Sequence, residues 1–523
     1  MAAGRVRTRP MRSIHRHSIS VRSFYKKLKQ MAKVSKKRGR EFNFSRFANR
    51  HIALKLAYDG RSFTGLATQG GGEGDNSVEK HLFEALEKVK LIAGRSGAKF
   101  SRAGRTDKGV SAFGQVVALQ ARSAFRPGTK PEAMPLHPSD AIVEVNEVGE
   151  RTQEKREIDY CGLLNRVLPE AIRVLAWAPV TEDFSARFSA ESRSYRYFFS
   201  ARGLDLSAMD EAARLLIGSH DFRNFCKMDV VNVRNFRRRV YRAAVRLVGH
   251  AEALAPGNSA PRMAVFEVEG NAFLWHMVRC IMQVLTYVGR GVEQPHIVSE
   301  LLDVELRPKK PHYPMAEDTG LVLHDCGYGH RLDFDFEARN LAHLQAHLTR
   351  RYEIHAVEAS KAADQLRALA GAKLRVEHVK AWLNEAVDFA IRKGLPDRAG
   401  QRLKERLLAA VDGEGAPALD WSTVLLLLHA ENVQIDHAGH LSLLSCRHTP
   451  LLEREAGPAY EEKIRLLGEK RRNEYEEKLE LSRKGQECEE DGEEGAARTR
   501  DKAFFQKMLK QGKMGQPDLH DAK

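Results

Sequence analysis

Asp107 is the carboxylate in this sequence whose neighbours best suit it for chemistry. It lies within a few residues of Arg102, Arg105 and Lys108, and Gly109 follows it. Glycine adopts the positive φ that a tight turn requires, so we expect a turn between two strands here. In an extended strand Arg105 would point to the same side as Asp107 and would stabilise its charge. A carboxylate held in this way can act as a nucleophile.

The same residues also fit a purely structural turn. In that alternative Asp107 closes a hairpin and pairs with Arg105, because Asp-x-Gly turns are common in proteins. The choice between the two interpretations depends on the rest of the chain.

The segment Gly104–Gln115 resembles the active-site signature of the TruA-type tRNA pseudouridine synthases. It reads Gly-Arg-Thr-Asp-Lys-Gly-Val-Ser-Ala-Phe-Gly-Gln, and it is most similar to the eukaryotic branch that modifies positions 38 and 39 of the tRNA anticodon arm. In that family the aspartate that matches Asp107 is the catalytic nucleophile. The resemblance therefore implies a tRNA substrate and a nucleophilic role for Asp107.

Further segments resemble the family in order and in approximate spacing, so the resemblance covers about residues 50 to 330. These segments are Leu54–Gly60, Asp183–Ala190 with Ser194–Tyr197, Asp221–Phe225, Asn271–Arg279 and Gly320–Leu323. The resemblance implies an α+β fold, in which two α/β lobes share a long mixed, largely antiparallel sheet with a central RNA-binding cleft. After the two lobes in the sequence, we expect a helical C-terminal extension.

Arg279 lies in a stretch with apolar residues almost all round, which predicts a buried helix over about 271–288. A buried guanidinium needs a partner, because an uncompensated charge in a core costs roughly 3–5 kcal/mol. The resemblance suggests that Arg279 faces Asp107 and takes part in substrate binding. The alternative is an unrelated structural salt bridge.

Tyr195 alternates with Tyr197 and Phe199 along a predicted strand over 193–200. An aromatic stripe with this spacing is typical of a core. The resemblance assigns Tyr195 to the uracil pocket, where it would stack on the base or receive the C5 proton, and it leaves Tyr197 in the core. It also implies that Leu321 walls the base pocket and that Arg105 fills or guides the space of the flipped base.

Arg234, Arg238, Arg242 and Arg246 recur at even spacing around a predicted strand at 237–248. Such a row can follow a phosphate backbone, although a solvated strand face explains it nearly as well. His276 is interpreted as a buried structural residue, because no set of His, Cys and carboxylates with metal-ligand spacing accompanies it. We therefore expect neither a metal nor a cofactor, and the isomerisation itself requires none.

The chain of 523 residues has a formal net charge of +16, and most of the excess lies in an arm at its start. Residues 1–40 contain 14 Lys or Arg and no Asp or Glu. This arm fits a phosphate-binding segment, a nuclear address at Lys33–Arg40 or a mitochondrial presequence. We expect the nucleus, the cytoplasm or both, with the mitochondrion as the alternative.

No apolar stretch is long enough for a membrane span or a secretory signal. The six cysteines include no C-x-x-C pair, which favours a reducing compartment and argues against structural zinc.

The expected organisation follows from composition and periodicity. A helix after 76, with Asn76 as its cap and Glu79 completing a capping-box-like pair, follows a strand at 51–58, and the polar stretch 147–157 would connect two lobes. The expected divisions are a basic arm at 1–48, catalytic lobes at 49–150 and 151–332, a helical extension at 333–455, and a charged helix with an acidic tail at 456–523.

These features together predict a tRNA pseudouridine synthase that acts on positions 38 and 39, with a homodimer as a further expectation. The alternatives are a related synthase that modifies other uridines in tRNA, small nuclear RNA or messenger RNA, and a tRNA-binding protein without turnover.

Overall fold

The computed structural model describes most of the chain between residues 42 and 469, and residues 1–41 of the basic arm and residues 470–523 with the acidic tail lie outside it. The described residues are 42–68, 74–130, 134–135, 140–145, 151–231, 233–248, 263–334, 336–370, 372–392, 397–413, 418–420, 424, 428, 433–435, 441–443 and 449–469. Residues up to Arg46 form a separate unit, of which a single short turn, Phe44–Arg46, is described. Everything below concerns the unit from Phe47 onward.

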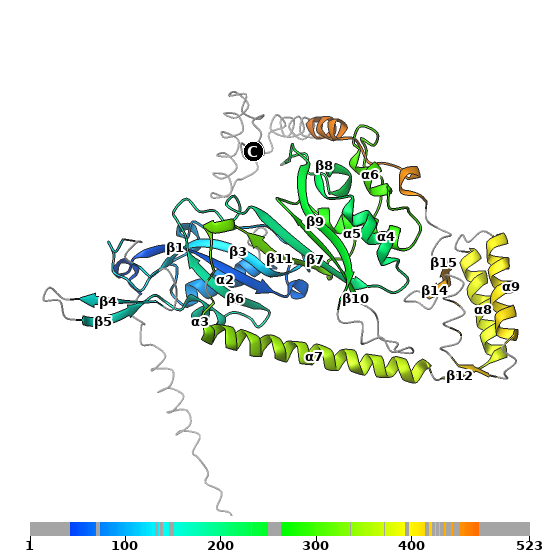
Figure 1. Ribbon diagram of the computed structural model, residues 1–523, viewed down its shortest axis with the longest axis horizontal. Coiled ribbons are helices and arrows are strands. Elements are labelled where there is room, and N and C mark those ends of the chain that lie inside the picture. The colour runs from blue at the N-terminus through cyan, green and yellow to red at the C-terminus, as the bar shows by residue number, and fades with distance from the viewer. Residues whose placement is uncertain are drawn as a thin grey trace, which may run out of the picture. The chain divides into compact units, whose positions relative to one another are not determined.

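One mixed sheet of nine strands organises this unit (Figure 1). The strand order is β6-β1-β3-β11-β7-β10-β9-β8, and β2 pairs with β3 beside this path. The strands are β1 (Asn49–Tyr58), β2 (Ser101–Arg102), β3 (Ser111–Arg122), β6 (Ile172–Pro179), β7 (Ser192–Ser200), β8 (Gly218–Asp221), β9 (Arg237–Leu247), β10 (Met263–Gly270) and β11 (Leu321–Gly327). The expected α+β fold with a long, largely antiparallel mixed sheet is confirmed.

β11 joins the two halves of the sheet. It pairs in parallel with the start of β3, where Val322 faces Ser111, and antiparallel with β7, where Leu323 faces Tyr195. A strand from late in the chain therefore lies between the first lobe and the second. The loop that leads into β3 reaches this junction, where Gly109 lies against the carboxyl group of Asp318, shortly before β11.

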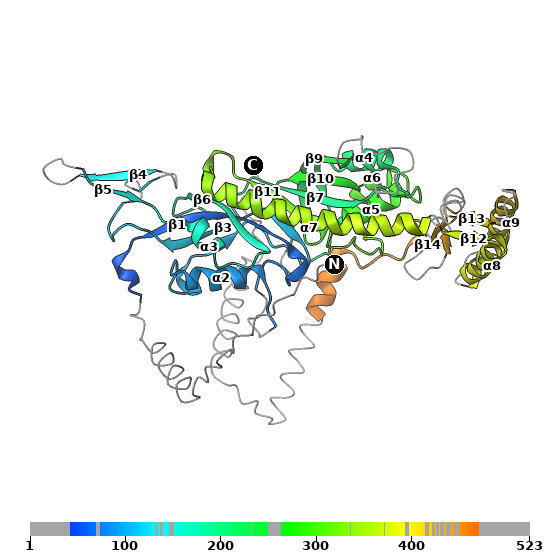
Figure 2. The same ribbon diagram turned by 90° about the horizontal axis from the view of Figure 1, so that it is seen from below.

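Helices bury each half of the sheet through their apolar sides. Leu82 and Leu86 pack with Leu54 of β1 in the first core, and Leu285 packs with Phe266 of β10 in the second. The helices are α2 (Val78–Lys88), α3 (Tyr160–Asn165), α4 (Leu206–Arg214), α5 (Met277–Gly289), α6 (Ile297–Leu302), α7 (Ala338–Ala370), α8 (Val376–Arg392) and α9 (Asp397–Gly413). Figure 2 shows α7 running as one long helix after the sheet is complete. None of the described helices has both the length and the apolar content to cross a membrane.

Two local expectations were wrong. Asn76 does not cap α2: the Ser77 hydroxyl accepts the N–H of Lys80, and Glu79 binds two arginines instead of closing a capping box. The buried α5 begins at Met277 and not near 271, because His276 has φ +61° and stops the helix there.

The polar stretch between the lobes is not a plain connection. Residues Ala141–Val145 (β4) and Arg151–Arg156 (β5) pair as a two-stranded antiparallel ribbon. The charged sequence of β5 lacks the alternation of apolar and polar residues that marks a half-buried strand, so periodicity could not reveal it. Two further small ribbons occur later in the chain, formed by β12 (Lys373–Arg375) with β13 (Ala418–Asp420) and by β14 (Val433–Ile435) with β15 (Leu441–Leu443).

The segment 449–469 returns to the second core after the helical extension. Leu451 is fully buried there, and its N–H donates to the carboxylate of Glu293 at 2.6 Å. Pro311 and Ala456 form a β-bridge, and the N–H of Gly457 donates to Lys310 at 2.9 Å. The segment 449–469 is therefore part of the second lobe.

Candidate active site

Asp107 lies in the loop between β2 and β3, at the junction of the two lobes. β2 ends at Arg102, so the chain lacks the extended conformation that would point Arg105 and Asp107 to the same side, and Asp107 lies at the turn that the sequence predicted. The carboxylate of Asp107 is about one-third exposed, at 31%. It is thus held by the protein and still reachable from outside.

Backbone contacts fix the shape of this loop. The N–H of Val110 donates to the backbone oxygen of Asp107 at 3.2 Å, and the N–H of Leu66 donates to the backbone oxygen of Thr106 at 3.1 Å. The hydroxyls of Tyr58 and Thr106 lie 2.7 Å apart. Gly109 has φ +80°, as the sequence predicted for this turn, and this conformation disfavours any residue with a side chain.

His276 is the described side chain that contacts the Asp107 carboxylate. Its Nε2 lies 3.4 Å from Oδ2 of Asp107. Burial lowers the pKa of His276, and the positive charges of Arg279, Lys227 and Lys310 lower it further, against the opposing effect of Asp107. The imidazole is therefore neutral at neutral pH. The sequence analysis assigned His276 a structural role. The signal that could have corrected this interpretation is that His276 lies within the signature segment Asn271–Arg279.

Arg279 does not form an ion pair with Asp107. Its guanidinium is buried, and its Nε donates to the backbone oxygen of Ala316 at 2.7 Å. The N–H of Ala316 in turn donates to the Arg279 backbone oxygen at 3.1 Å. Burial raises the pKa of Tyr197 and the charge of Arg279 offsets part of this rise, whereas in His276 the same charge adds to the lowering of the pKa by burial.

Arg105 is exposed and, among the described residues, makes no ion pair with Asp107. The expected pairing depended on a strand that continued to Asp107, and the chain instead turns after Arg102. Arg102 itself binds Glu79. Of the cations near Asp107 in the sequence, Arg102 is therefore bound by a different carboxylate.

Tyr195 and Leu321 come together on one side of the junction. Leu321 pairs across from Tyr197, and Leu323 pairs across from Tyr195, so these side chains share one face of the sheet. Tyr197 is buried in the core, as predicted, and its hydroxyl donates to the backbone oxygen of Glu317 at 2.9 Å. Tyr195 is only partly buried and packs edge-on against Phe273, with ring centroids 5.0 Å apart.

The Tyr195 hydroxyl stays protonated at neutral pH. Burial raises its pKa well above the ordinary value, and the negative charge of Asp107 contributes to the rise.

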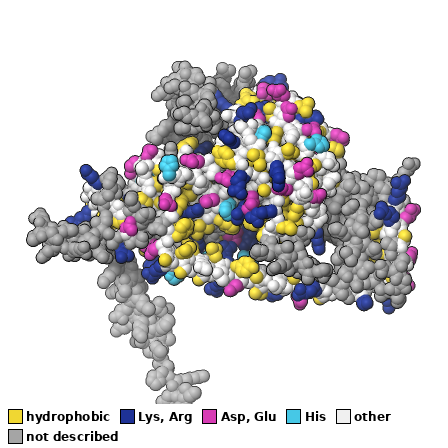
Figure 3. Space-filling view, in the orientation of Figure 1, with side chains coloured by type: hydrophobic (Ala, Val, Ile, Leu, Met, Phe, Trp, Pro, Cys, Tyr) yellow, Lys and Arg dark blue, Asp and Glu magenta, His cyan; other side chains and the backbone are white. Residues whose placement is uncertain are grey.

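An exposed tryptophan borders the site on the α5 side. Trp275 is 46% exposed, and its ring lies 4.8 Å from that of His276. The ammonium group of Lys227 lies 4.2 Å from the centre of the Trp275 ring. Figure 3 shows Lys and Arg side chains gathered beside a hollow in the middle of the face in view.

The predicted arginine row is broken by a β-bulge. Arg242 pairs with Glu269 and Val240 pairs with Gly270, so Tyr241 is an extra residue in β9. The bulge reverses which side of the strand the even-numbered residues face. Before it, Arg238 is on the same side as buried Val240; after it, Arg242 and Arg246 are on the side opposite to the buried residues of β9. Arg242 and Arg246 thus remain on the exposed side, and the four arginines do not form one continuous row.

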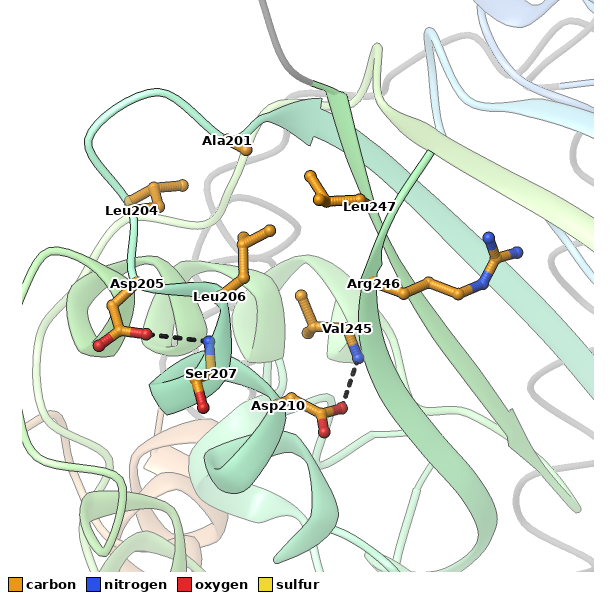
Figure 4. Close-up of a pocket in the computed structure, with 9 residues that line it drawn as sticks. All are labelled: Ala201, Leu204, Asp205, Leu206, Ser207, Asp210, Val245, Arg246 and Leu247. Carbon is orange, nitrogen blue, oxygen red and sulfur yellow. Dashed lines mark hydrogen bonds between the residues drawn. The ribbon is translucent and has the colours of Figure 1, made fainter. Parts of the chain in front are cut away.

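Arg246 is also occupied by a carboxylate. It donates two hydrogen bonds to Glu267, at 2.8 and 3.0 Å. A hollow of about 480 Å³ lies next to it, but the Arg246 guanidinium points away from that hollow (Figure 4). Two carboxylates line this hollow, and both serve the fold. The carboxylate of Asp205 caps α4 by accepting the N–H of Ser207, and the carboxylate of Asp210 accepts the N–H of Val245. Within the described part of the chain, no group of His, Cys, Asp and Glu is arranged to hold a metal ion.

Comparison with known proteins gives a consistent result. The tRNA pseudouridine synthase family matches residues 212–329. The tRNA pseudouridine(38/39) synthase of Homo sapiens is 46% identical over 310 residues, which are 58% of this chain and 62% of that protein. The chain therefore spans a little less than two thirds of the length of this relative.

Two more distant relatives are covered more completely. The tRNA pseudouridine(38/39) synthase of Saccharomyces cerevisiae is 36% identical over 332 residues, 62% of this chain and 68% of that protein. The tRNA pseudouridine synthase A of Methanosarcina mazei is 33% identical over 283 residues, 54% of this chain and 86% of that protein.

Proposed function

This chain belongs to the tRNA pseudouridine synthase family, and from that premise we propose that it isomerises uridine to pseudouridine in the anticodon stem-loop of tRNA, at positions 38 and 39. The observation that carries the proposal is the placement of Asp107, a partly exposed carboxylate on a rigid loop where the two lobes meet. The names of the eukaryotic relatives support positions 38 and 39.

The reaction needs a nucleophile and a place to hold a detached base. The N1–C1′ glycosidic bond of the uridine breaks, the uracil turns, C1′ bonds to C5, and the C5 proton is lost while N1 gains one. Asp107 would attack C1′ of the ribose or C6 of the uracil, or promote formation of a ribose glycal. Each route requires a carboxylate beside the flipped base.

Tyr195 and Leu321 would hold the base, and Arg105 would enter the space that the base leaves. The raised pKa of Tyr195 favours the stacking role, because a phenol that stays protonated is a poor acceptor for the C5 proton. Arg279 would act at a distance through its charge. The exposed position of Arg105 suits a side chain that moves with the substrate.

Arg242 is the member of the arginine row that best suits contact with a phosphate, because it is exposed and Arg246 is held by Glu267. We also propose, on the family resemblance alone, that the reaction requires no metal and that the protein forms a homodimer. The proposed compartment is the nucleus or the cytoplasm, with the mitochondrion as the alternative.

The test compares wild type with Asp107→Asn, which keeps the shape of the side chain and removes its charge. Unmodified tRNAs with U38 or U39 are incubated with each protein, and pseudouridine is mapped by carbodiimide treatment and primer extension. We expect product at those sites from wild type, and none from Asp107→Asn despite tRNA binding within a few-fold of wild type. Asp364→Asn is the control, because this carboxylate on α7 is 78% exposed.

Each other outcome is informative. Product at other uridines would keep the chemistry and favour the related synthase. Binding without product from wild type would favour the tRNA-binding protein, and full activity of Asp107→Asn would exclude Asp107 as the nucleophile.

A further inference from the structure

A second hollow, of about 700 Å³, lies beside β2 and outside the active site. We call it the β2 pocket. Four cations line it, Arg95, Lys99, Arg102 and Arg187, together with the carboxylate of Glu79. Its volume is in the range of pockets that hold small organic ligands. The excess of cations selects for an anionic one.

Glu79 organises the floor of this pocket. It is almost fully buried, and both Arg95 and Arg102 donate to its carboxylate. Arg95 also donates to the hydroxyl of Thr68 at 3.2 Å and stacks over the ring of Phe83 at 4.6 Å. One carboxylate balances one of the two guanidinium charges.

Both arginines are thereby fixed and still have donors to spare. A guanidinium has five N–H groups, and these two use few of them on Glu79 and Thr68. The side chains of Arg95 and Arg102 are 49% and 25% exposed. A pre-organised pair of partly exposed guanidiniums suits a phosphate group, which accepts two parallel hydrogen bonds.

The rim of the pocket provides an aromatic surface. Phe188 is 71% exposed, and the guanidinium of Arg187 lies 5.2 Å from the centre of its ring. Among the described residues, the Arg187 side chain pairs with no carboxylate. Lys99 pairs with Glu182 at 3.2 Å, but both side chains are about two-thirds exposed, so this pair is weak and exchangeable.

The side chain of Arg193 links the pocket to the loop that carries Asp107. Arg193 donates to the backbone oxygen of Ala103 at 3.1 Å and to that of Arg187 at 2.6 Å. The segment that carries Phe188 is thus held against the chain where it leaves β2 for Asp107. The β2 pocket is therefore joined through Arg193 to the loop that carries Asp107.

We propose that the β2 pocket binds one nucleotide of the tRNA other than the target uridine. Its phosphate would lie on Arg95 and Arg102, and its base would stack on Phe188. Stacking on an aromatic ring combined with cations for the backbone is a usual way to hold single-stranded RNA. The inference rests on the proposed function in one respect, that the bound RNA is a tRNA.

The experiment changes the rim and leaves the floor intact, because removing Arg95 or Arg102 would leave Glu79 buried with fewer partners. Phe188→Ala and Arg187→Gln are compared with Tyr352→Ala on α7 and Arg202→Gln, which are exposed residues outside the pocket. The dissociation constant for unmodified tRNA is measured at several salt concentrations, together with KM and kcat.

We expect Phe188→Ala to weaken tRNA binding about ten-fold and to raise KM more than it changes kcat. Arg187→Gln should reduce the slope of log K against log salt by about one. A photoreactive phenylalanine analogue at position 188 should cross-link to a tRNA nucleotide that is neither U38 nor U39.

The inference is overturned if both rim variants bind tRNA like their controls, or if the cross-link falls on the target uridine itself. Its failure can be separated from failure of the proposed function. A wild-type protein that isomerises tRNA while the rim variants bind normally would refute the pocket alone. Weakened binding by a protein without turnover would support the pocket and refute the enzyme.

Discussion

At the scale of single residues, the site depends on a carboxylate beside a neutral imidazole. Asp107 and His276 come from opposite lobes, and their side chains lie 3.4 Å apart. Because burial and nearby cations lower the pKa of His276, it does not neutralise the carboxylate at neutral pH. A protonated His276 would attract Asp107 and compete with the substrate for it.

The contact between His276 and Asp107 predicts loss of activity in acid. Because the pKa of His276 is lowered, turnover should be constant above pH 6.5 and should fall at lower pH, where the imidazole gains a proton. His276→Gln, which cannot gain the proton, should show a smaller fall over this range. Initial rates at saturating tRNA from pH 5.5 to 8 test this, and parallel profiles for the two proteins would contradict it.

The pH dependence of the stability of the free protein should also depend on the protonation of His276. The unfolded chain binds the proton near pH 6.5, before the folded protein does, so the contribution of His276 is complete above that pH and is lost as pH falls below it. Between pH 7.5 and 5.5 the melting temperature should therefore fall more for wild type than for His276→Gln.

At the scale of elements, one tight turn positions Asp107, the proposed nucleophile. Gly109 has φ +80°, and a Cβ at this position would lie 2.7 Å from the carboxyl carbon of Asp318, which precedes β11. Gly104 in the same loop has open space around its Cβ position. The turn therefore has no room for a side chain at Gly109, next to β3, but has room for one at Gly104.

Gly109→Ala should destabilise the protein by about 1–3 kcal/mol, because alanine is strained at this φ and collides with Asp318. Gly104→Ala should change the free energy of unfolding by less than about 1 kcal/mol, because it meets no neighbour. Urea unfolding of both variants gives the comparison. Equal losses would mean that the conformation of Gly109 does not hold the turn.

At the scale of the whole molecule, segments far apart in the sequence complete each lobe. β11 lies between β3 and β7, and Leu451 fills the second core from beyond the helical extension. Val379, Leu383 and Val387 of α8 pack with Leu407 of α9 in a smaller core of their own. We propose that this extension is an accessory module inserted before the chain returns to the catalytic lobe.

The return of the chain predicts a stability effect far from the site in sequence. Leu451→Ala removes a fully buried side chain and should cost about 2–5 kcal/mol of unfolding free energy. Leu466→Ala is the matched control, because that leucine is 45% exposed and its loss should cost less than about 1 kcal/mol. Equal effects in chemical denaturation would show that segment 449–469 is not part of the folded core.

The sequence alone determined the local features, because turn chemistry, periodicity and signature residues act over a few positions. These include the Asp107–Gly109 turn, the strands near 51–58, 193–200 and 237–248, the buried helix around Arg279 and the core position of Tyr197. The tertiary structure decided what meets across the lobes: His276 and not Arg279 beside Asp107, the bulge that divides the arginine row, and the pairing of β11 with β3. Periodicity carries no information on such contacts, because they depend on register and on chain return over hundreds of residues.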